Sequence, residues 1–404
     1  MTLLSDNSRR SQSRFDWPLL VGVYALSVLG ILCICMATYD IDKSAGQPLL
    51  NKILNSRSSM WQSIFLLISP IIIGVVMAIP TEFIRARVSL AYNIVLGLLA
   101  ITLVAGEVSN NLKGWLNTGM GRSVQPCEFA KLSVMLLLAK QLSLQDNPIK
   151  NFKDFMRIGL IVGIPALVVL AQGETGTVIV IAFMFFAMLF FGGVDWRLLM
   201  TLLIVVAVGI GLIVAYALMS ETTDYRILRL LAFMDPQKYA DSGGYQIIKS
   251  QNAIGSGQLT GIGTFLPASW TTLGYVPEAS TDSVFSVVGE SFGFVGCMGV
   301  LAVYLFLVLR MLYLARFTND KFGRLVIVGV MSMLFFHVFQ NIAMGIGYMP
   351  ITGIPLPFLS YGGSNFVTNI AAISLVLNIT KGRTASSVIT IQLPKINTKK
   401  DAQA

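Results

Sequence analysis

Four ionisable side chains interrupt runs of apolar residues, at positions suited to acid–base and anion chemistry. Asp282 ends the polar segment 277–283, immediately before a long apolar run. Glu128 and Lys131 lie three residues apart at the start of another run, so on a helix they share a face and can pair. Glu174 stands at a polar break between two further runs. Ionisable groups in such surroundings are costly, which makes each of them a candidate for function.

The chemistry open to these groups differs from one to the next. A partly desolvated carboxylate has a raised pKa and can act as a general base, and the position of Asp282 suits that role. An exposed helix-capping aspartate is the alternative interpretation of Asp282. Glu128 and Lys131 form either a structural ion pair or a group that holds and polarises a substrate. Glu174 is either a functional carboxylate or simply the first residue of a helix.

Other polar residues inside apolar runs have less distinctive patterns. His337 has no partner histidine, so it is expected to form a hydrogen bond between helices. The same run also holds Gln340 and Asn341. Glu290 is either structural or lines a cavity. The four cysteines lack the spacing of metal ligands, which argues against zinc, and they are predicted to be small apolar packing residues. They are Cys33, Cys35, Cys127 and Cys297.

The segment 347–364 combines three prolines and four glycines in an otherwise apolar region. Proline removes a backbone donor and breaks a regular helix. Irregular backbone at membrane depth is tolerated only where protein buries it or where it lines a cavity. The segment is therefore predicted to be either a structural re-entrant turn or the wall of a cavity.

Composition decides the class of protein that must position these groups. Of the 404 residues, 55% are hydrophobic and only 12% are charged, against roughly 25% charged in ordinary globular domains. No soluble core hides that much apolar surface, so a membrane protein is expected. The net charge of +9 does not indicate nucleic acid, because the basic residues lie in short connections between apolar runs instead of in one stripe.

Runs of about 20 apolar residues predict an all-α polytopic membrane protein with about ten transmembrane helices. The spans are expected near 18–38, 61–80, 88–106, 127–145, 156–172, 174–193, 197–219, 283–312, 324–346 and 357–379. The predicted organisation is a tail over 1–17, a single membrane domain over 18–383 and a second tail over 384–404.

Lysine and arginine predict the orientation of the spans. With the N-terminus inside, the short outer loops hold few basic residues, so both termini are expected to be cytoplasmic. The basic residues of these outer loops are Lys43, Lys52, Arg57, Lys113 and Arg122. Glu128, Lys131, Glu174 and Asp282 then all lie toward the outer leaflet.

A large extracellular loop, about 220–282, is expected between the seventh and eighth spans. Residues 225–231 are typical of a short amphipathic helix on the membrane surface. The glycine-punctuated stretch 243–263 suits close backbone packing or ligand approach.

Six motifs, in this order, resemble those of the RodA/FtsW/SpoVE family, the SEDS proteins of shape, elongation, division and sporulation. The resemblance covers essentially the whole chain. Its motifs include Trp115 to Gly119, Gln125 to Lys131, Gly244-Tyr245-Gln246 to Ser250, Ala253 to Gly257, Pro277 to Asp282 with Gly289-Glu290, and Leu356 to Ser364 with Ser360-Tyr361-Gly362-Gly363. Within the family, Thr352 to Pro357 resembles the RodA branch, which implies a role in cell elongation and rod shape.

The resemblance implies a peptidoglycan glycosyltransferase in the bacterial cytoplasmic membrane, with its active site facing outside. Such proteins polymerise lipid II and release undecaprenyl pyrophosphate. The family's catalytic aspartate falls on Asp282 and its conserved Glu and Lys on Glu128 and Lys131. The other motif residues are expected to bind substrate or support the site: Trp115, Gln125, Glu174, Tyr245, Gln246, Ser360, Tyr361, Gly362 and Gly363.

The implied partners are the lipid II substrate, a class B penicillin-binding protein that cross-links the glycan, and the elongation machinery. The leaving pyrophosphate needs positive charge, from Lys131, Arg226 or Arg229, or from a divalent cation such as Mg²⁺ or Mn²⁺. The sequence leaves open whether a metal is required.

This chain departs from the family pattern at four places. Cys127 replaces a serine, and Gly114 stands where an arginine commonly precedes the tryptophan. Gly173-Glu174 replaces a Pro-Asp pair, and Ser283 replaces an aromatic residue after the aspartate. The change at Glu174 lengthens the side chain, which puts a catalytic role there most in doubt.

Two other classes of function compete with the polymerase. A lipid II flippase predicts polar residues through the full membrane depth and symmetry between two halves, and no internal repeat is found. A non-catalytic scaffold for the penicillin-binding protein predicts that the Asp282→Asn substitution leaves function intact.

Overall fold

The computed structural model describes residues 15–39, 46–109, 112–117, 123–144, 149, 152–219, 225–240 and 243–381. Over these ranges the chain forms thirteen helices and three short strands. The predicted tails 1–17 and 384–404 lie almost entirely outside the described residues. The division of the chain into one domain with two tails therefore stays a prediction.

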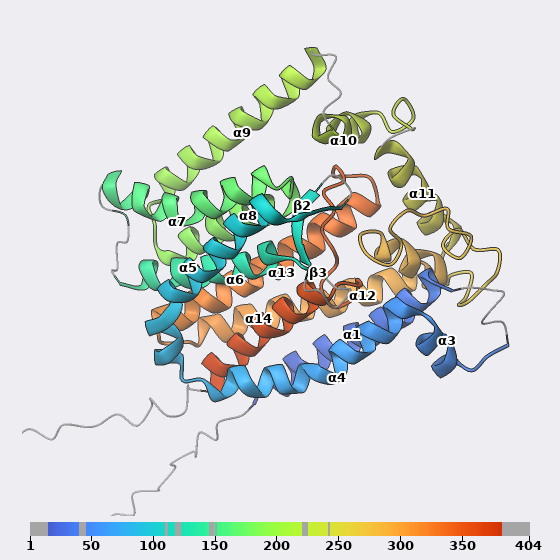
Figure 1. Cartoon of the computed structure of the whole chain (residues 1–404), viewed down its shortest axis with the longest axis horizontal. Helices are drawn as coiled ribbons and strands as arrows, with labels where there is room; N and C mark the ends of the chain where they lie inside the picture. Colours follow the sequence, from blue (N-terminus) through green and yellow to red (C-terminus); the bar gives the residue numbers. More distant parts are fainter. Residues whose placement is uncertain are drawn as a thin grey trace, which may run out of the picture.

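Each of the ten predicted spans corresponds to one helix of the bundle (Figure 1). Nine of these helices, within the described ranges, are long and apolar enough to cross a membrane. The tenth, α6, carries Glu128, Lys131 and Lys140, yet most of its side chains are buried against other helices. The ten are α1 (Trp17–Ala37), α4 (Arg57–Ala78), α5 (Thr81–Ala105), α6 (Pro126–Ser143), α7 (Phe152–Ala171), α8 (Thr175–Gly192), α9 (Trp196–Met219), α12 (Val284–Arg316), α13 (Lys321–Gly345) and α14 (Gly363–Lys381).

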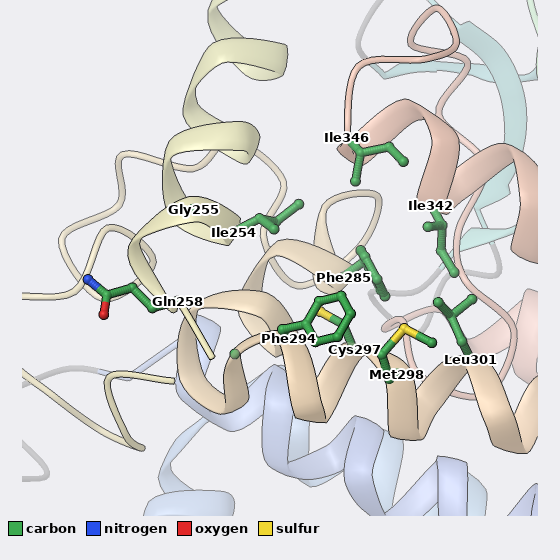
Figure 2. A pocket seen from close by; sticks show the side chains of 11 residues that line it. Ile254, Gly255, Gln258, Phe285, Phe294, Cys297, Met298, Leu301, Ile342 and Ile346 are labelled. Carbon is green, nitrogen blue, oxygen red and sulfur yellow. The ribbon is translucent and has the colours of Figure 1, made fainter. Parts of the chain in front are cut away.

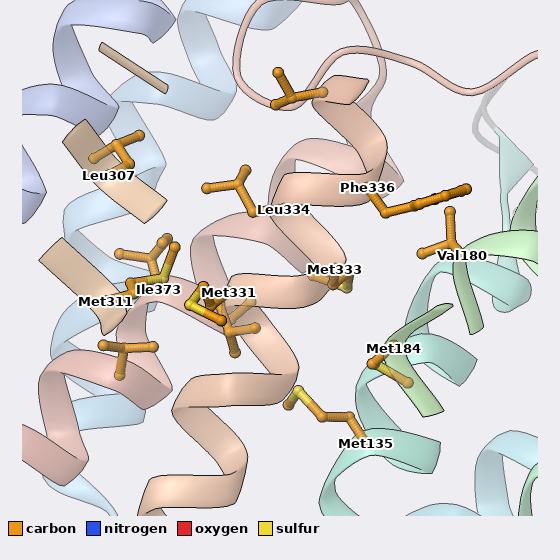
Figure 3. Close-up of a cluster of buried hydrophobic side chains, with 14 of the residues drawn as sticks. Met135, Val180, Met184, Leu307, Met311, Met331, Met333, Leu334, Phe336 and Ile373 are labelled. Carbon is orange, nitrogen blue, oxygen red and sulfur yellow. The ribbon is translucent and has the colours of Figure 1, made fainter. Parts of the chain in front are cut away.

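Helix α13 lies at the centre of the bundle and packs against α6, α8, α11, α12 and α14. About 83% of its most apolar stretch is buried, against 6% for α9, which extends away from the bundle (Figure 1). Methionines from three helices surround α13 near Met331 and Met333 (Figure 3). Gly329 lets the α6 side chain of Met135 approach the α13 backbone, because a Cβ there would collide with it. Close approach at small residues is how helices associate where lipid is as apolar as their side chains.

A short sheet lies in the connection between α5 and α6, a feature the apolar pattern did not predict. Strands β1 (Glu107–Ser109), β2 (Leu112–Asn117) and β3 (Ser123–Val124) pair antiparallel in that order. In the register of β1 and β2, Glu107 pairs with Trp115. The sheet places Gly114 and Trp115 at the end of the bundle where α6 begins.

The large loop contains two helices, α10 (Tyr225–Met234) and α11 (Gly243–Ser256), and the short helix α3 (Leu49–Asn55) precedes α4. Helix α10 confirms the amphipathic helix predicted from residue 225. Helix α11 packs along α12, and the approach is close because Gly257 faces the backbone oxygen of Gly289. Gly257 and Gly261 therefore serve close backbone packing, one of the two roles predicted for this stretch.

Helix α12 is broken at Gly293, where the backbone has φ 64° and ψ −161°. Loop residues 258–263 bond to the polar backbone groups on both sides of the break. The amides of Phe294 and Val295 donate to the oxygens of Gln258 and Leu259, at 2.8 and 3.1 Å. In return, the amides of Ile262 and Gly263 donate to the oxygens of Glu290 and Ser291. The loop thus supplies the hydrogen bonds that the helix lacks at its break, as an apolar environment requires.

Substituting Gly293 by alanine should destabilise the protein, because only glycine readily adopts this backbone conformation and a Cβ would meet the backbone of Gly261. We expect a loss of at least about 2 kcal/mol, seen as a lower melting temperature in detergent. Gly299→Ala is the control, since that glycine lies in the same helix with open space around it. Equal melting temperatures for the two variants would contradict the assigned role of the break.

Candidate active site

Asp282 lies between the large loop and the start of α12, and α13 fixes its backbone. The Asn341 side-chain amide donates to the carbonyl oxygen of Asp282 and to that of Ile354, each at 2.8 Å. Asn341 is almost fully buried, so its bond to Ile354 is shielded from water and its bond to Asp282 is partly shielded. Asn341 thus links Asp282 to the proline-rich segment.

The proline-rich segment is irregular over residues 346–362 and runs beside Asp282. The Ser360 hydroxyl donates to the carbonyl oxygen of Thr281 and accepts from the amide of Leu356. The Tyr361 amide donates to the oxygen of Ser280 at 2.8 Å. The predicted site residues Ser360 and Tyr361 thus hold the backbone that carries Asp282.

The final span begins at Gly363, not near 357 as predicted, because prolines and the left-handed residue Phe358 (φ 69°) precede it. The backbone amide of Phe366 donates a hydrogen bond to the carbonyl oxygen of Gly362. Gly363 packs against the ring of Phe65 in α4. These two predicted site residues therefore begin α14 and seat it on α4.

The Asp282 side chain is partly buried and faces several charged groups. Burial raises its pKa to about 7, and the neighbouring Glu278 and Glu174 add to the rise while Arg229 opposes it. A Cβ on Gly353 would lie 3.5 Å from Asp282 Oδ2, so the proline-rich segment passes beside this carboxylate. A carboxylate with a pKa near 7 is well suited to take a proton at neutral pH.

Glu174 lies across the proline-rich segment from Asp282. Gly176, two residues along the chain, packs against the backbone of Thr352, and Arg229 interacts electrostatically with both carboxylates. Gln125 Nε2 donates to Glu174 Oε1 at 2.6 Å. Burial raises the pKa of Glu174, and the bond from Gln125 opposes that rise.

The position of Glu174 also depends on two of the departures from the family pattern. A Cβ on Gly114 would lie 2.7 Å from Glu174 Oε1, so the longer carboxylate uses the space that the glycine leaves. Trp115, next to Gly114 on β2, is partly buried, and none of the described side-chain contacts links it to Asp282. The backbone amide of Gln125 in turn donates to the Ser364 hydroxyl at 3.1 Å.

Glu128 and Lys131 form a buried ion pair within a longer polar network. Lys131 Nζ lies 2.9 Å from Glu128 Oε1 and 2.9 Å from His337 Nε2. His337 Nδ1 faces the Met333 oxygen, so Nδ1 carries the proton and Nε2 accepts from Lys131. Asn365 donates to the other oxygen of Glu128 at 3.1 Å. The network joins α6, α13 and α14.

Tyr245 and Gln246 lie at the start of α11. Gln246 Nε2 donates to the Ser283 hydroxyl at 3.2 Å, so it reaches the residue that follows Asp282. Tyr245 is 40% exposed and belongs to a separate aromatic cluster described below.

Sequence reasoning missed one functional candidate, Asn365, and did not predict the contact between His337 and Lys131. Asn365, a polar residue in an apolar span, carried the same signal as Asn341 and was passed over. The place of His337 beside Lys131 has no local signal, because the two residues are 206 positions apart.

Two open, apolar pockets lie apart from the acid–base residues of the site. One of about 400 Å³ lies between α11, α12 and α13, where Ile254, Phe285 and Met298 line it together with Ile342 (Figure 2). Another of about 350 Å³ lies between α1 and α12. The reacting groups predicted from the sequence line neither pocket.

The long apolar helices of the bundle, with an irregular, carboxylate-bearing site at one end, define a polytopic membrane protein. Similarity to known proteins identifies its family. The family model described as "cell cycle protein", for FtsW, RodA and SpoVE, matches residues 18–385. The chain belongs to this family.

Curated relatives come from both branches of the family. The peptidoglycan glycosyltransferase MrdB of Escherichia coli K12 is 35% identical over 310 residues, which are 76% of this chain and 82% of MrdB. The probable peptidoglycan glycosyltransferase FtsW of Bacillus subtilis is 34% identical over 70% of this chain and 71% of its own.

Solved structures agree with the fold. A chain from a peptidoglycan synthase complex that coordinates polymerisation and crosslinking matches with a TM-score of 0.73 at 29% identity, covering 91% of this chain and 98% of that one. RodA of Thermus thermophilus matches with a TM-score of 0.65 at 26% identity, covering 91% and 97%.

Removing one member of the buried ion pair should cost more stability than removing both. Lys131→Met leaves Glu128 as an uncompensated buried charge, for which we expect a loss of about 3 to 5 kcal/mol. Adding Glu128→Gln removes that charge while keeping an acceptor for Asn365, so the double variant should recover most of the loss. Melting temperatures in detergent compare the three proteins. A double variant less stable than Lys131→Met alone would rule out this account.

Proposed function

We propose that this protein is a peptidoglycan glycosyltransferase that joins lipid II units through β-1,4 bonds during cell elongation. The observation that carries the proposal is Asp282, a fixed, partly buried carboxylate with a pKa near 7. The relatives MrdB and FtsW bear the name of this activity, and the RodA-like sequence from Thr352 to Pro357 favours the elongation branch.

In the proposed reaction, Asp282 removes the proton from the acceptor sugar hydroxyl. The oxygen then attacks the anomeric carbon of the donor sugar, forming the new glycosidic bond with inversion. The bond from that carbon to the pyrophosphate breaks, and undecaprenyl pyrophosphate leaves with the bonding electrons. Asp282 afterwards gives its proton to solvent. General base catalysis of this kind contributes typically about 10²- to 10⁴-fold to a rate.

The leaving pyrophosphate requires positive charge, which Arg229 is placed to supply. Arg229 donates to the Ile351 oxygen and faces both Asp282 and Glu174 electrostatically. Lys131 contributes less directly, because Glu128 and His337 already engage its ammonium group. The side chain of Arg226, the third predicted cation, lies outside the described part of the chain.

If a divalent cation takes part, we propose that it is bound mainly by the substrate. Among the described residues, no three His, Cys, Asp or Glu side chains gather closely enough to hold a metal ion. Mg²⁺ is commonly bound by one or two carboxylates together with substrate phosphates. If a cation takes part, pyrophosphate oxygens would supply most of its ligands and neutralise part of its charge, with Glu174 as a candidate carboxylate.

The proposed setting is the bacterial cytoplasmic membrane, with both termini inside and Asp282 facing outside. The distribution of basic residues supports this orientation. The proposed partner is a class B penicillin-binding protein of the elongation machinery, which cross-links the polymer. The similarity to a chain of a peptidoglycan synthase complex supports such an assembly.

The direct test is polymerisation of purified lipid II by wild type and Asp282→Asn, each copurified with its class B partner. A β-lactam blocks the transpeptidase of the partner. We expect long glycan from wild type and a loss of at least about 100-fold from the variant, because asparagine cannot take the proton. An unchanged melting temperature shows that the variant is folded.

Other outcomes favour the competing functions. Equal polymer from both proteins would remove Asp282 as the base. Transfer of lipid II across vesicles without polymer would favour a flippase. Neither polymer nor transfer from an intact complex would favour a scaffold.

The polymerisation rate should depend on pH through the ionisation of Asp282. The base acts only when deprotonated, so the rate should rise through about pH 7 and level off above it. Glu278→Gln removes a negative charge that raises the pKa of Asp282, so this variant should shift the midpoint to lower pH. Initial rates between pH 5.5 and 8.5 measure both profiles. A midpoint that stays unchanged in Glu278→Gln would contradict the assignment.

A further inference from the structure

A cluster of aromatic residues on the large loop surrounds one lysine. Lys249 Nζ lies 5.3, 5.0 and 5.5 Å from the ring centroids of Tyr245, Trp270 and Tyr275. Trp270 and Tyr275 also pack edge to face at 5.7 Å. We refer to these four residues as the aromatic platform. Tyr245 and Tyr275 are 40% and 46% exposed, which leaves ring surface open to a ligand.

The aromatic platform is held rigidly by a helix of the bundle. Glu290 in α12 is fully buried, and its two carboxylate oxygens accept the backbone amides of Trp270 and Thr271. The amide of Tyr275 donates to the oxygen of Trp270 at 3.0 Å, which fixes the turn between the two rings. A buried carboxylate in a membrane helix is costly, so its use to fix an exposed loop points to a function for that loop.

Helix α11 connects the aromatic platform to the reaction centre. Gln246, which bonds to Ser283 next to Asp282, follows Tyr245 directly in the chain. Lys249 comes one turn after Tyr245, on the same face of the helix. The first turns of α11 therefore carry both the contact to Ser283, next to Asp282, and two members of the aromatic platform.

The surface chemistry of the aromatic platform suits a glycan strand. Sugar rings present faces of C–H groups that pack on aromatic rings, while their hydroxyls remain in water. The ammonium of Lys249 adds positive charge for the carboxylates of the attached stem peptides. We propose that the aromatic platform binds the growing glycan strand next to the reaction centre and retains it between additions. This inference rests on the proposed polymerase function.

The test compares glycan length at equal consumption of lipid II, using the complex with its class B partner and a β-lactam. In Tyr275→Ala the strands should be shorter by about fivefold, the ratio that a loss of about 1 kcal/mol of ring contact implies. Tyr275→Phe keeps the ring and should restore long strands. Tyr313→Ala is the matched control, because Tyr313 is 52% exposed and lies near the last turn of α12, outside both the aromatic platform and the candidate active site. Strands of wild-type length from Tyr275→Ala would overturn the proposal.

A binding measurement separates this inference from the polymerase itself. Calorimetry with a soluble, lipid-free glycan oligomer that carries stem peptides should show about fivefold weaker binding to Tyr275→Ala than to wild type or Tyr313→Ala. This readout works even if a variant or the wild type makes no polymer. Equal binding by all three proteins would overturn the proposal. So would unchanged glycan binding combined with loss of the penicillin-binding protein on copurification, since the surface would then be a protein contact.

Discussion

One buried amide, that of Asn341, supports the arrangement around Asp282. It bonds at once to the backbone of Asp282 and to that of Ile354, so one side chain of the central helix fixes both the loop and the proline-rich segment. Backbone groups in an apolar environment must find partners within the protein. The irregular segment meets that requirement through Asn341, Ser360 and the amide of Tyr361.

The ionisable groups of the site divide into two sets with different physical roles. Glu128 and Lys131 neutralise each other in a closed network with His337 and Asn365, which ties three helices together. Burial and the neighbouring Glu278 raise the pKa of Asp282 to about 7, although Arg229 opposes the rise. A paired charge gives rigidity, whereas a carboxylate that is costly to ionise stays ready to take up a proton. The network around Glu128 and Lys131 stabilises the packing of α13, the helix whose Asn341 holds the backbone of Asp282.

Patterns local in the sequence predicted much of this structure. The ten apolar runs gave ten helices, and the spacing of Glu128 and Lys131 predicted their pairing. The start of α14 was misplaced, because a composition of apolar residues and prolines does not say where the irregular segment ends. The break in α12 depends on loop residues about 35 positions earlier, and the aromatic platform joins α11 to a turn near residue 270. Contacts between such distant segments leave no periodic signal in one sequence.

The hydrogen bonds at the break in α12 bear on how the chain is assembled during synthesis. Residues 258–263, which satisfy the exposed backbone amides beside Gly293, are made before α12 itself. On the proposed orientation they have already been translocated when that helix enters the membrane. The backbone groups that bond to the break are therefore already at the outer surface. Helix α12 need not pass through a state with unpaired backbone groups in lipid. A loop joined to α12 from its other end would arrive too late to do this, so the order of the two segments along the chain favours correct insertion.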